Sequence, residues 1–346
     1  MQIRPLRQSP PKLISVNFFL GLQLSKFLSF KEEVRVLKTS LAPLKGNLKY
    51  TIHQDDICLS IETNQPIYIC GNKKAEGTHS FSAIETDGSD ESTVKNYSND
   101  FSRIATKLLS GFSNTAEFRS FLMPAGSRLF TYVCASKGAI RAINSNGIDF
   151  NNIANRVGTI TPSEESLKRF RSAVKSALDH SLDSPRNGRG LDHLNKSKIC
   201  NCIGECFSHK TNDSDIALKL THRHELCKDL VFWAYDNIDQ PVSLEKAITA
   251  LHTTSASLSQ GCKEILGIGP MEIIRHIRLE HIHFILSNRD VRLNYGFTSV
   301  EGVRENFGFK TRGNFSALYK KYFDETPKET LLKSNNSPQK YLSSHH

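Results

Sequence analysis

Long apolar segments are missing from this sequence of 346 residues. No stretch approaches the roughly 18 consecutive apolar residues of a membrane-spanning helix. A mostly apolar run, Leu13–Leu22, follows the cations Arg4, Arg7 and Lys12, but it is short and lacks a small-residue cleavage site after it, so a secretory signal is not expected. We expect a cytoplasmic protein with no membrane contact.

Enzyme signatures are also missing. The sequence has no P-loop, no GxGxxG segment and no Ser/His/Asp arrangement. Residues 46–160, which read as β-rich, contain only two histidines, His53 and His79, in separate strands or loops. A metal-dependent enzyme built on a β-barrel needs clustered histidine and carboxylate ligands. We therefore expect no catalytic residues, no cofactor and no enzyme.

The eight cysteines do not form the framework of a disulfide-rich protein in a chain of this length. Five stand singly, and three cluster as Cys200, Cys202 and Cys206, with His209 three residues further on. Thiolates with an imidazole can hold zinc, and the Cys202–Cys206 spacing fits that use. The cluster as a whole matches no standard zinc motif and lies in a polar segment, where reduced thiols are commoner. We expect no metal, with zinc at this cluster as the alternative.

Charge is what the chain does carry: 45 Lys and Arg stand against 35 Asp and Glu, a net charge of +10. This favours a polyanionic partner, although net charge speaks to non-specific binding and not to fold. Residues 226–333 hold 14 cations and 13 carboxylates, so this segment is nearly neutral. To bind a polyanion, it would need its cations on one face. The run Lys310–Lys321 does this locally, with four cations and no carboxylate.

The front half shows strand patterns. Short apolar or alternating runs are separated by turn residues, at Asn47–Ile52, Ile57–Ile61, Pro66–Cys70, Phe121–Pro124 and Leu129–Cys134. Several short strands at this spacing predict a sandwich or a small, cupin-like barrel. The acidic, polar section Glu85–Asn99 is expected to be a mobile loop.

A helix is predicted after these strands. Ser163 is its cap, and Leu167, Phe170, Val174 and Leu178 form one apolar stripe. The expected organisation is an α+β chain of two domains with a linker, divided as residues 1–45 (N-terminal segment), 46–180 (β-rich sensor or dimerisation domain with its closing helix), 181–215 (polar linker), 216–333 (all-α domain) and 334–346 (disordered tail).

Two blocks of helix-turn-helix size follow one another in the all-α domain, bridged by an amphipathic helix. In the first, a helix over Ser243–Leu251 and a short turn precede a second helix over Ser255–Leu266, capped by Thr254 or Ser255 and stopped by Gly267. Pro270 opens the bridging helix, whose isoleucines are expected to be core. His276, His281 and His283 on that helix are expected at the surface and not at a metal.

The second block ends in Gly308-Phe309-Lys310-Thr311-Arg312-Gly313-Asn314-Phe315-Ser316, then Tyr319-Lys320-Lys321-Tyr322-Phe323 and Thr326-Pro327. A short helix with polar residues at its start and cations along one side suits the major groove of DNA. Together with Leu266-Gly267-Ile268-Gly269-Pro270-Met271 and Ile274-Arg275-His276-Ile277-Arg278-Leu279, this string resembles the AraC/XylS family of transcription regulators over about Leu230–Leu332. Around Asn64–Gly71 and Leu122–Gly126 the front half resembles, far more weakly, the ethanolamine-operon regulator branch.

The resemblance implies two helix-turn-helix units that read successive major-groove segments on one face of double-stranded DNA. It would place base-reading residues on both units, namely Ser255, Ala256, Ser259 and Gln260 in the first and Lys310, Thr311, Arg312 and Asn314 in the second. By side-chain chemistry, Gln260 suits adenine and Arg312 suits guanine. Phosphate contacts are expected from Thr254, Lys263, Lys320 and Lys321.

The same resemblance implies RNA polymerase as a partner, a small-molecule effector for the front half, a possible homodimer and an activator role. Several residues depart from the family pattern, and Ala256, Ala317 and Gly313 give little to contact DNA. Gly302 and Arg304 replace an acidic residue and a small one, and Arg304 should crowd the helix packing unless it reaches solvent. The alternative is therefore a degenerate helix-turn-helix protein that binds proteins, or DNA without specificity.

Overall fold

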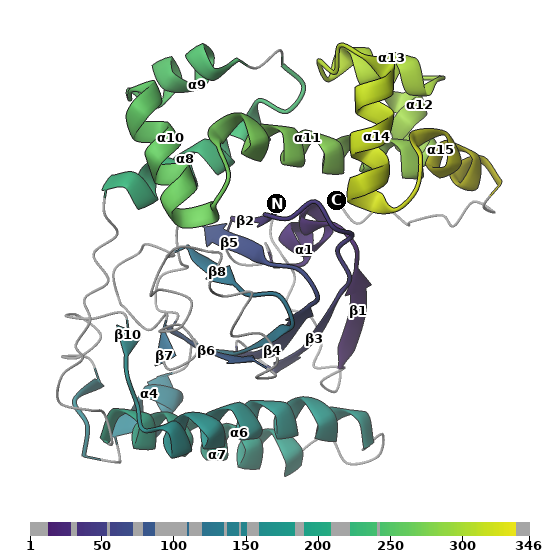
Figure 1. Ribbon diagram of the computed structural model, residues 1–346. Helices are drawn as coiled ribbons and strands as arrows, with labels where there is room; N and C mark the ends of the chain where they lie inside the picture. The colour runs from purple at the N-terminus through teal and green to yellow at the C-terminus, as the bar shows by residue number, and fades with distance from the viewer. Residues whose placement is uncertain are drawn as a thin grey trace, which may run out of the picture.

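The computed structural model describes residues 13–28, 33–53, 56–71, 79–86, 109–110, 120–134, 137–144, 147–150, 159–183, 190–208, 222–240 and 243–336. Within these ranges, no helix is long and apolar enough to cross a membrane. In Figure 1 the described elements form layers, with two helices under a β-sheet, a second sheet above it, and the C-terminal helices on top.

Two antiparallel sheets make up the front half, and the described strands close no barrel. The larger sheet has the order β1-β3-β4-β9-β6-β7-β10, and the smaller has the order β2-β5-β8. The strands are β1 Ile14–Phe18, β2 Val34–Lys38, β3 Gly46–His53, β4 Asp56–Thr63, β5 Ile67–Gly71, β6 His79–Thr86, β7 Leu109–Ser110, β8 Phe121–Met123, β9 Ser127–Cys134 and β10 Thr159–Ile160. The predicted β-rich class is confirmed, in the sandwich form of the prediction. The strands begin at Ile14, earlier than expected.

Successive side chains of a strand point to opposite faces, and both sheets use both faces. In β4, Ile57 and Ile61 fill the core between the two sheets, while Cys58 faces away from it. In β5, Ile67 enters that same core and Tyr68 the next one. Almost every residue of β4 and β5 is therefore covered, although only β5 has a continuously apolar sequence.

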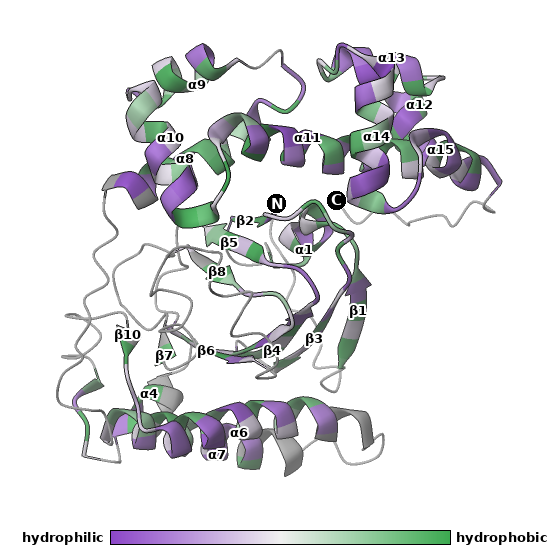
Figure 2. Cartoon of the chain, in the orientation of Figure 1, coloured by the Kyte–Doolittle hydropathy of each residue, from purple (hydrophilic) through white to green (hydrophobic). Residues whose placement is uncertain are grey.

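Two helices cover the outer face of the larger sheet: α6 (Glu164–Asp183) and α7 (Gly190–Ser208). The predicted cap and stripe of α6 are confirmed, since Ser163 Oγ accepts a hydrogen bond from the Ser166 amide at 3.2 Å and the four stripe residues are buried. Hydrophobic and hydrophilic residues alternate along both helices in Figure 2, as expected for helices with one covered face.

The expected polar linker over residues 181–215 is wrong for residues 190–208, which form α7. Ile199, Ile203 and Phe207 lie one turn apart and are buried against the sheet and α6. Cys200, Cys202 and Cys206 are buried with them as free thiols. The polar composition hid this helix, because the cysteines act here as small hydrophobic side chains. His209 lies outside the described residues.

The C-terminal helices are α8 His222–Asp236, α9 Leu244–Ala250, α10 Ser255–Leu266, α11 Pro270–Ser287, α12 Arg289–Asn294, α13 Val300–Asn306, α14 Arg312–Phe323 and α15 Pro327–Asn336. Two short elements complete the description: α1 Gly21–Leu28 and α4 Lys137–Asn144. Part of the tail expected to be disordered is helical, because Ser334 and Asn335 belong to α15 and accept hydrogen bonds from buried Arg292. Residues 337–346 and the predicted loop residues 87–99 lie outside the described residues.

The smaller sheet packs directly against these helices. Leu37, Tyr68 and Cys70 share one hydrophobic core with α8, α10 and α11. Polar contacts tie the same junction: Tyr235 Oη on α8 donates to the Val36 carbonyl at 2.7 Å, and Glu280 on α11 accepts from the Leu22 amide at 2.9 Å. The C-terminal helices are thus seated on the front half by a continuous interface.

Two helical glycines test how tightly the C-terminal helices pack. A Cβ added at Gly261 in α10 would lie 2.9 Å from the Arg223 carbonyl oxygen of α8, whereas one at Gly302 in α13 meets nothing nearer than 3.6 Å. Gly261→Ala should therefore lower the free energy of unfolding by about 1–3 kcal/mol, and Gly302→Ala should raise it by about 0.5–1 kcal/mol. Urea unfolding of both variants measures this, and stabilisation by Gly261→Ala would contradict the packing described.

Candidate nucleic-acid interface

The first helix-turn-helix unit consists of α9 and α10. The Thr254 side chain accepts a hydrogen bond from the Ser257 amide at 3.2 Å and so caps α10, as predicted. Gly267 ends the helix at φ 71° in the left-handed region, where glycine has no steric cost. Leu258 and Cys262 are buried, which leaves Ser255, Ala256 and Gln260 exposed on the other side of the helix.

The second unit consists of α13 and α14. Ser299 caps α13 by accepting from the Gly302 amide, and Gly308 turns the chain at φ 78°. Phe315, Tyr319 and Tyr322 bury one side of α14, and the other side exposes Arg312, Gly313 and Asn314. Thr311 is at the cap position of α14 but makes no capping hydrogen bond through its side chain, so its hydroxyl stays open to a ligand.

Helix α11 joins the two units. Pro270 lies in its first turn, as predicted, and the predicted apolar core residues are buried, namely Ile273, Ile274, Ile277, Leu279, Ile282, Ile285 and Leu286. The surface position expected for its histidines is wrong. His276 is 1% exposed, with Nδ1 3.1 Å from the Lys38 carbonyl oxygen, and His283 Nδ1 lies 2.8 Å from Tyr319 Oη. Burial lowers the pKa of each of these two to about 4.

Gln260 is held in place by an acidic neighbour. Its Nε2 donates to Glu264 Oε1 at 2.9 Å, and the same oxygen lies 2.7 Å from Arg223 Nη1. Arg223 balances the Glu264 carboxylate, which would otherwise repel phosphate beside the first reading helix. This bond uses one of the two N–H donors of the Gln260 amide, so its second N–H and its Oε1 can still contact adenine.

Arg304 was expected to crowd the helix packing unless its head reached solvent. It stays buried instead, and its guanidinium is held by hydrogen bonds. Its guanidinium is covered and contacts Glu301, Glu305 and the Phe309 carbonyl. The hydrogen bond from Arg304 lowers the pKa of Glu301, and the charge of Arg312 adds a smaller contribution in the same direction. Arg304 thus ties α13 to the turn before α14 and balances two carboxylates beside α14.

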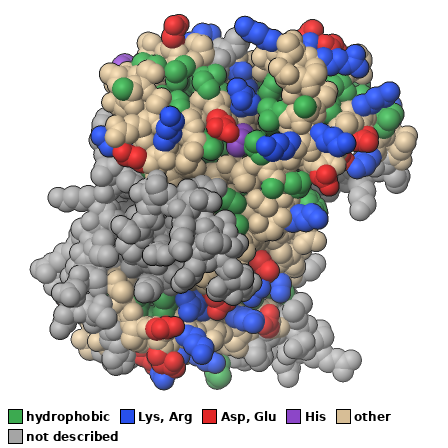
Figure 3. All heavy atoms as spheres, viewed as in Figure 1, with side chains coloured by type: hydrophobic (Ala, Val, Ile, Leu, Met, Phe, Trp, Pro, Cys, Tyr) green, Lys and Arg blue, Asp and Glu red, His purple; other side chains and the backbone are tan. Residues whose placement is uncertain are grey.

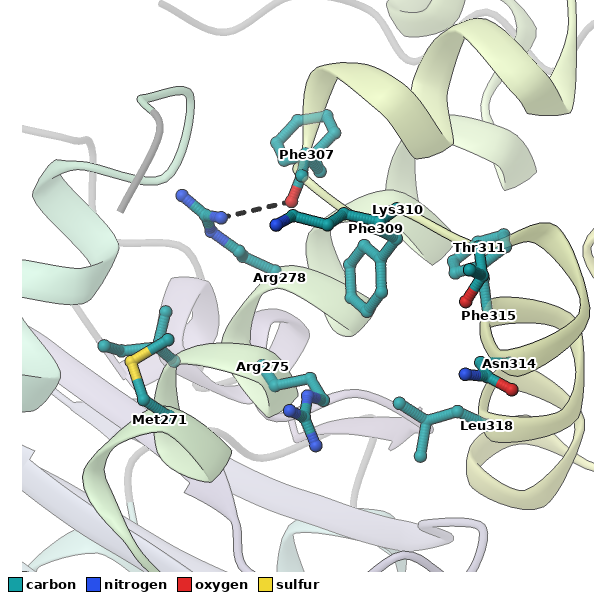
Figure 4. A pocket seen from close by; sticks show the side chains of 12 residues that line it. Met271, Arg275, Arg278, Phe307, Phe309, Lys310, Thr311, Asn314, Phe315 and Leu318 are labelled. Carbon is teal, nitrogen blue, oxygen red and sulfur yellow. Dashed lines mark hydrogen bonds between the residues drawn. The ribbon is translucent and has the colours of Figure 1, made fainter. Parts of the chain in front are cut away.

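A groove of about 360 Å³ lies between α11 and α14 (Figure 4). Its lining includes three cations, Arg275, Arg278 and Lys310, and no carboxylate. Thr311 and Asn314, both expected to read bases, line it as well. The motif pointed to α14 but not to this groove, because the pattern of α11 identified its core residues and gave no role to the arginines between them.

Each predicted contact residue lies within the described chain. Seven of the eight base-reading candidates are exposed, and Ser259 is half-buried. The phosphate candidates Lys263, Lys320 and Lys321 are exposed, whereas the Thr254 hydroxyl already donates to Ser257 Oγ at 3.0 Å. In Figure 3, Lys and Arg side chains gather over the C-terminal helices, with fewer carboxylates between them. The described residues contain no group of three or more His, Cys, Asp or Glu placed to hold a metal.

Comparison with known proteins matches the same part of the chain. Residues 248–333 match the helix-turn-helix domain family. The "XylDLEGF operon transcriptional activator 2" of Pseudomonas putida is 29% identical over 113 residues, which cover 32% of this chain and 69% of that protein.

Solved structures were also matched. A probable AraC family transcriptional regulator from Rhodopseudomonas palustris CGA009 is 24% identical, covers 32% of this chain and 97% of its own, and has a TM-score of 0.29. ToxT from Vibrio cholerae O395 is 11% identical, covers 94% of this chain and 99% of its own, and also has a TM-score of 0.29. These TM-scores are too low to support an argument about the fold. The arrangement of the two halves is therefore described only from the contacts within this chain.

The paired units, each with a second helix exposed on one side, and the largely buried bridging helix define a helix-turn-helix domain. Over this part of the chain, the resemblance to transcription regulators of the AraC/XylS type that the motif predicted is confirmed. The weak resemblance of the front half to the ethanolamine-operon branch stays a prediction.

The buried histidines give stability a pH dependence. A histidine whose pKa falls from 6.5 to about 4 on folding binds fewer protons in the folded state than in the unfolded state between those values, so stability rises with pH there. Each such group contributes a slope of about 1.4 kcal/mol per pH unit. The slope of the unfolding free energy between pH 5 and 6 should be smaller by about this amount in His276→Gln than in the parent chain. Equal slopes would show that His276 titrates normally.

Proposed function

We propose that this regulator reads a bipartite DNA site, with α10 and α14 in successive major-groove segments. The observation that carries the proposal is the pair of helices α10 and α14, each buried on one side and exposing short polar or basic side chains near its start. Side chains at the start of such a helix reach base edges when the helix enters the major groove. Since most residues of α11 are buried against both units, one helix supports the two of them.

The two units differ in their contact chemistry. Around α14, exposed Lys310, Arg312 and Asn314 offer hydrogen-bond donors to bases, with Lys320 and Lys321 in the last turn. On α10 the exposed side chains are smaller, and Gln260 is engaged by Glu264. We propose that Arg312 makes the stronger base contact, and that the exposed lysines contribute affinity without sequence information.

The roles beyond DNA binding are also proposals. An activator role is supported by the named activator function of the Pseudomonas putida relative. A cytoplasmic location, contact with RNA polymerase, dimerisation and an effector bound by the front half follow from the family. An effector can act only if it binds one conformation of the chain better than another.

Selection of bound duplexes from a random library by the full chain tests the main proposal. The expected result is an enriched site with two halves about one helical turn apart. Arg312→Ala should relax the preference at one position of one half, at a cost of about 1–3 kcal/mol. Lys321→Ala, the matched control on the same helix, should leave the enriched sequence unchanged and reduce the salt dependence of binding by about one phosphate contact.

Other results have defined meanings. A single enriched half-site would show that one unit has lost base reading. Weak binding to every duplex, with no enrichment, would contradict sequence-specific reading and support the degenerate alternative, to which Ala256, Gly313 and Ala317 lend some weight.

We further propose that the front half acts on the second reading helix through Lys38, the last residue of β2. Its Nζ donates to the Tyr322 carbonyl of α14 at 3.2 Å and to the Ala42 carbonyl at 2.8 Å, and it lies 3.2 Å from the centre of the Tyr322 ring. Burial lowers the pKa of Lys38, and the Glu280 charge opposes this shift. Burial likewise raises the pKa of Glu280, and Lys38 opposes it. The two charges therefore depend on each other.

Lys38→Met should lower the free energy of unfolding by about 2 kcal/mol or more, because Glu280 loses its compensating charge. Adding Glu280→Gln should recover part of this loss, since the remaining amide carries no charge. In the folded single variant, the affinity for the selected DNA site should also change, although no exposed residue of α14 is altered. An unchanged DNA affinity would show that this contact does not couple the two halves.

A further inference from the structure

Helix α11 exposes one cationic side chain, Arg275. Among its eighteen residues, Met271, Arg275 and Ser287 are exposed, and most of the others are buried. Arg275 makes no hydrogen bond or ion pair with any residue that the structure describes. An unpaired charge on a helix surface is usually only solvated. The residues around Arg275 decide whether it is solvated or placed to bind a ligand.

The surroundings of Arg275 are cationic and open. It shares the groove between α11 and α14 with Arg278 and Lys310, and the lining contains no carboxylate. Arg278 is fixed, since Nη1 donates to the Phe307 carbonyl at 3.1 Å and Nη2 to the Gln240 carbonyl. Arg275 and Lys310 are exposed on opposite walls of the groove, and the fixed Arg278 lines it as well. Such a concentration of one sign favours an anion.

The groove is continuous with the proposed base-reading surface. Thr311 and Asn314 belong both to its lining and to the start of α14. The bridging helix runs between the two units, so its exposed face lies between the two DNA segments that they would read (Figure 1). The anion that such a position offers to the protein is the phosphate backbone between those segments.

We propose that α11 is a third DNA-binding element and that Arg275 contacts a backbone phosphate in the groove between α11 and α14. The inference rests on the proposed function and extends it to a helix that the motif assigns to structure alone. Lys310 adds positive charge to the groove from the α14 side, and Arg278 supports the groove without leaving its carbonyl partners. Because phosphates carry no sequence information, this contact adds affinity and salt dependence and leaves base preference unchanged.

The test compares Arg275→Gln with two controls in the full chain. Arg275→Lys keeps the charge, and Lys175→Gln removes one exposed charge from α6, at the far end of the molecule from the C-terminal helices (Figure 1). Binding to one duplex is measured over a range of salt concentrations. For Arg275→Gln we expect the slope of log K against log salt to fall by about 0.9 and the affinity at low salt to fall about tenfold. Both controls should keep a slope near that of the parent chain.

The enriched sequence selected by Arg275→Gln should be that of the parent chain. An unchanged slope in Arg275→Gln, or a loss equal to that of Lys175→Gln, would overturn the third contact. A changed base preference would overturn its assignment to phosphate. Failure of the parent chain to enrich any sequence would instead overturn the proposed function, and the slopes measured on a random duplex would still decide whether Arg275 contacts DNA.

Discussion

The burial of α11 is the constraint on which the rest of the structure depends. This helix contributes to the core of the first helix-turn-helix unit, to that of the second, and to the interface with β2. Its covered surface fixes the position of α10 relative to α14, and the proposed reading of two successive major-groove segments depends on that position. The same burial lowers the pKa of His276 and covers Arg278, which donates to the Phe307 carbonyl.

Much of this was readable from the sequence because local physics fixed it. Caps such as Ser163 and Thr254, the stop at Gly267 and the proline that opens α11 are short-range signals, and each is found where expected. The short runs of β3, β4 and β9 were also recognised, because turn residues separate them in the sequence.

Long-range partners were not readable. The contacts of His276 with Lys38 and of Arg304 with Phe309 depend on how distant segments meet, and a pattern of residue types does not carry that information. Helix α7 was missed because its apolar residues are sparse and its thiols were read as possible ligands. The exposed residues of α10 and α14 were found, but whether they contact bases depends on DNA that is external to the fold.

The smaller sheet has a further consequence for how such a regulator can be rearranged. Its strands β2 and β5 are a wall between two hydrophobic cores, and alternate side chains of each strand belong to different cores. Tyr68 and Cys70 therefore belong to the hydrophobic core of the C-terminal helices, although they lie some 150 positions earlier in the chain. A chimera joined between α7 and α8 would carry a foreign surface under α8, α10 and α11. The natural unit of exchange is the helical domain together with the sheet on which it rests.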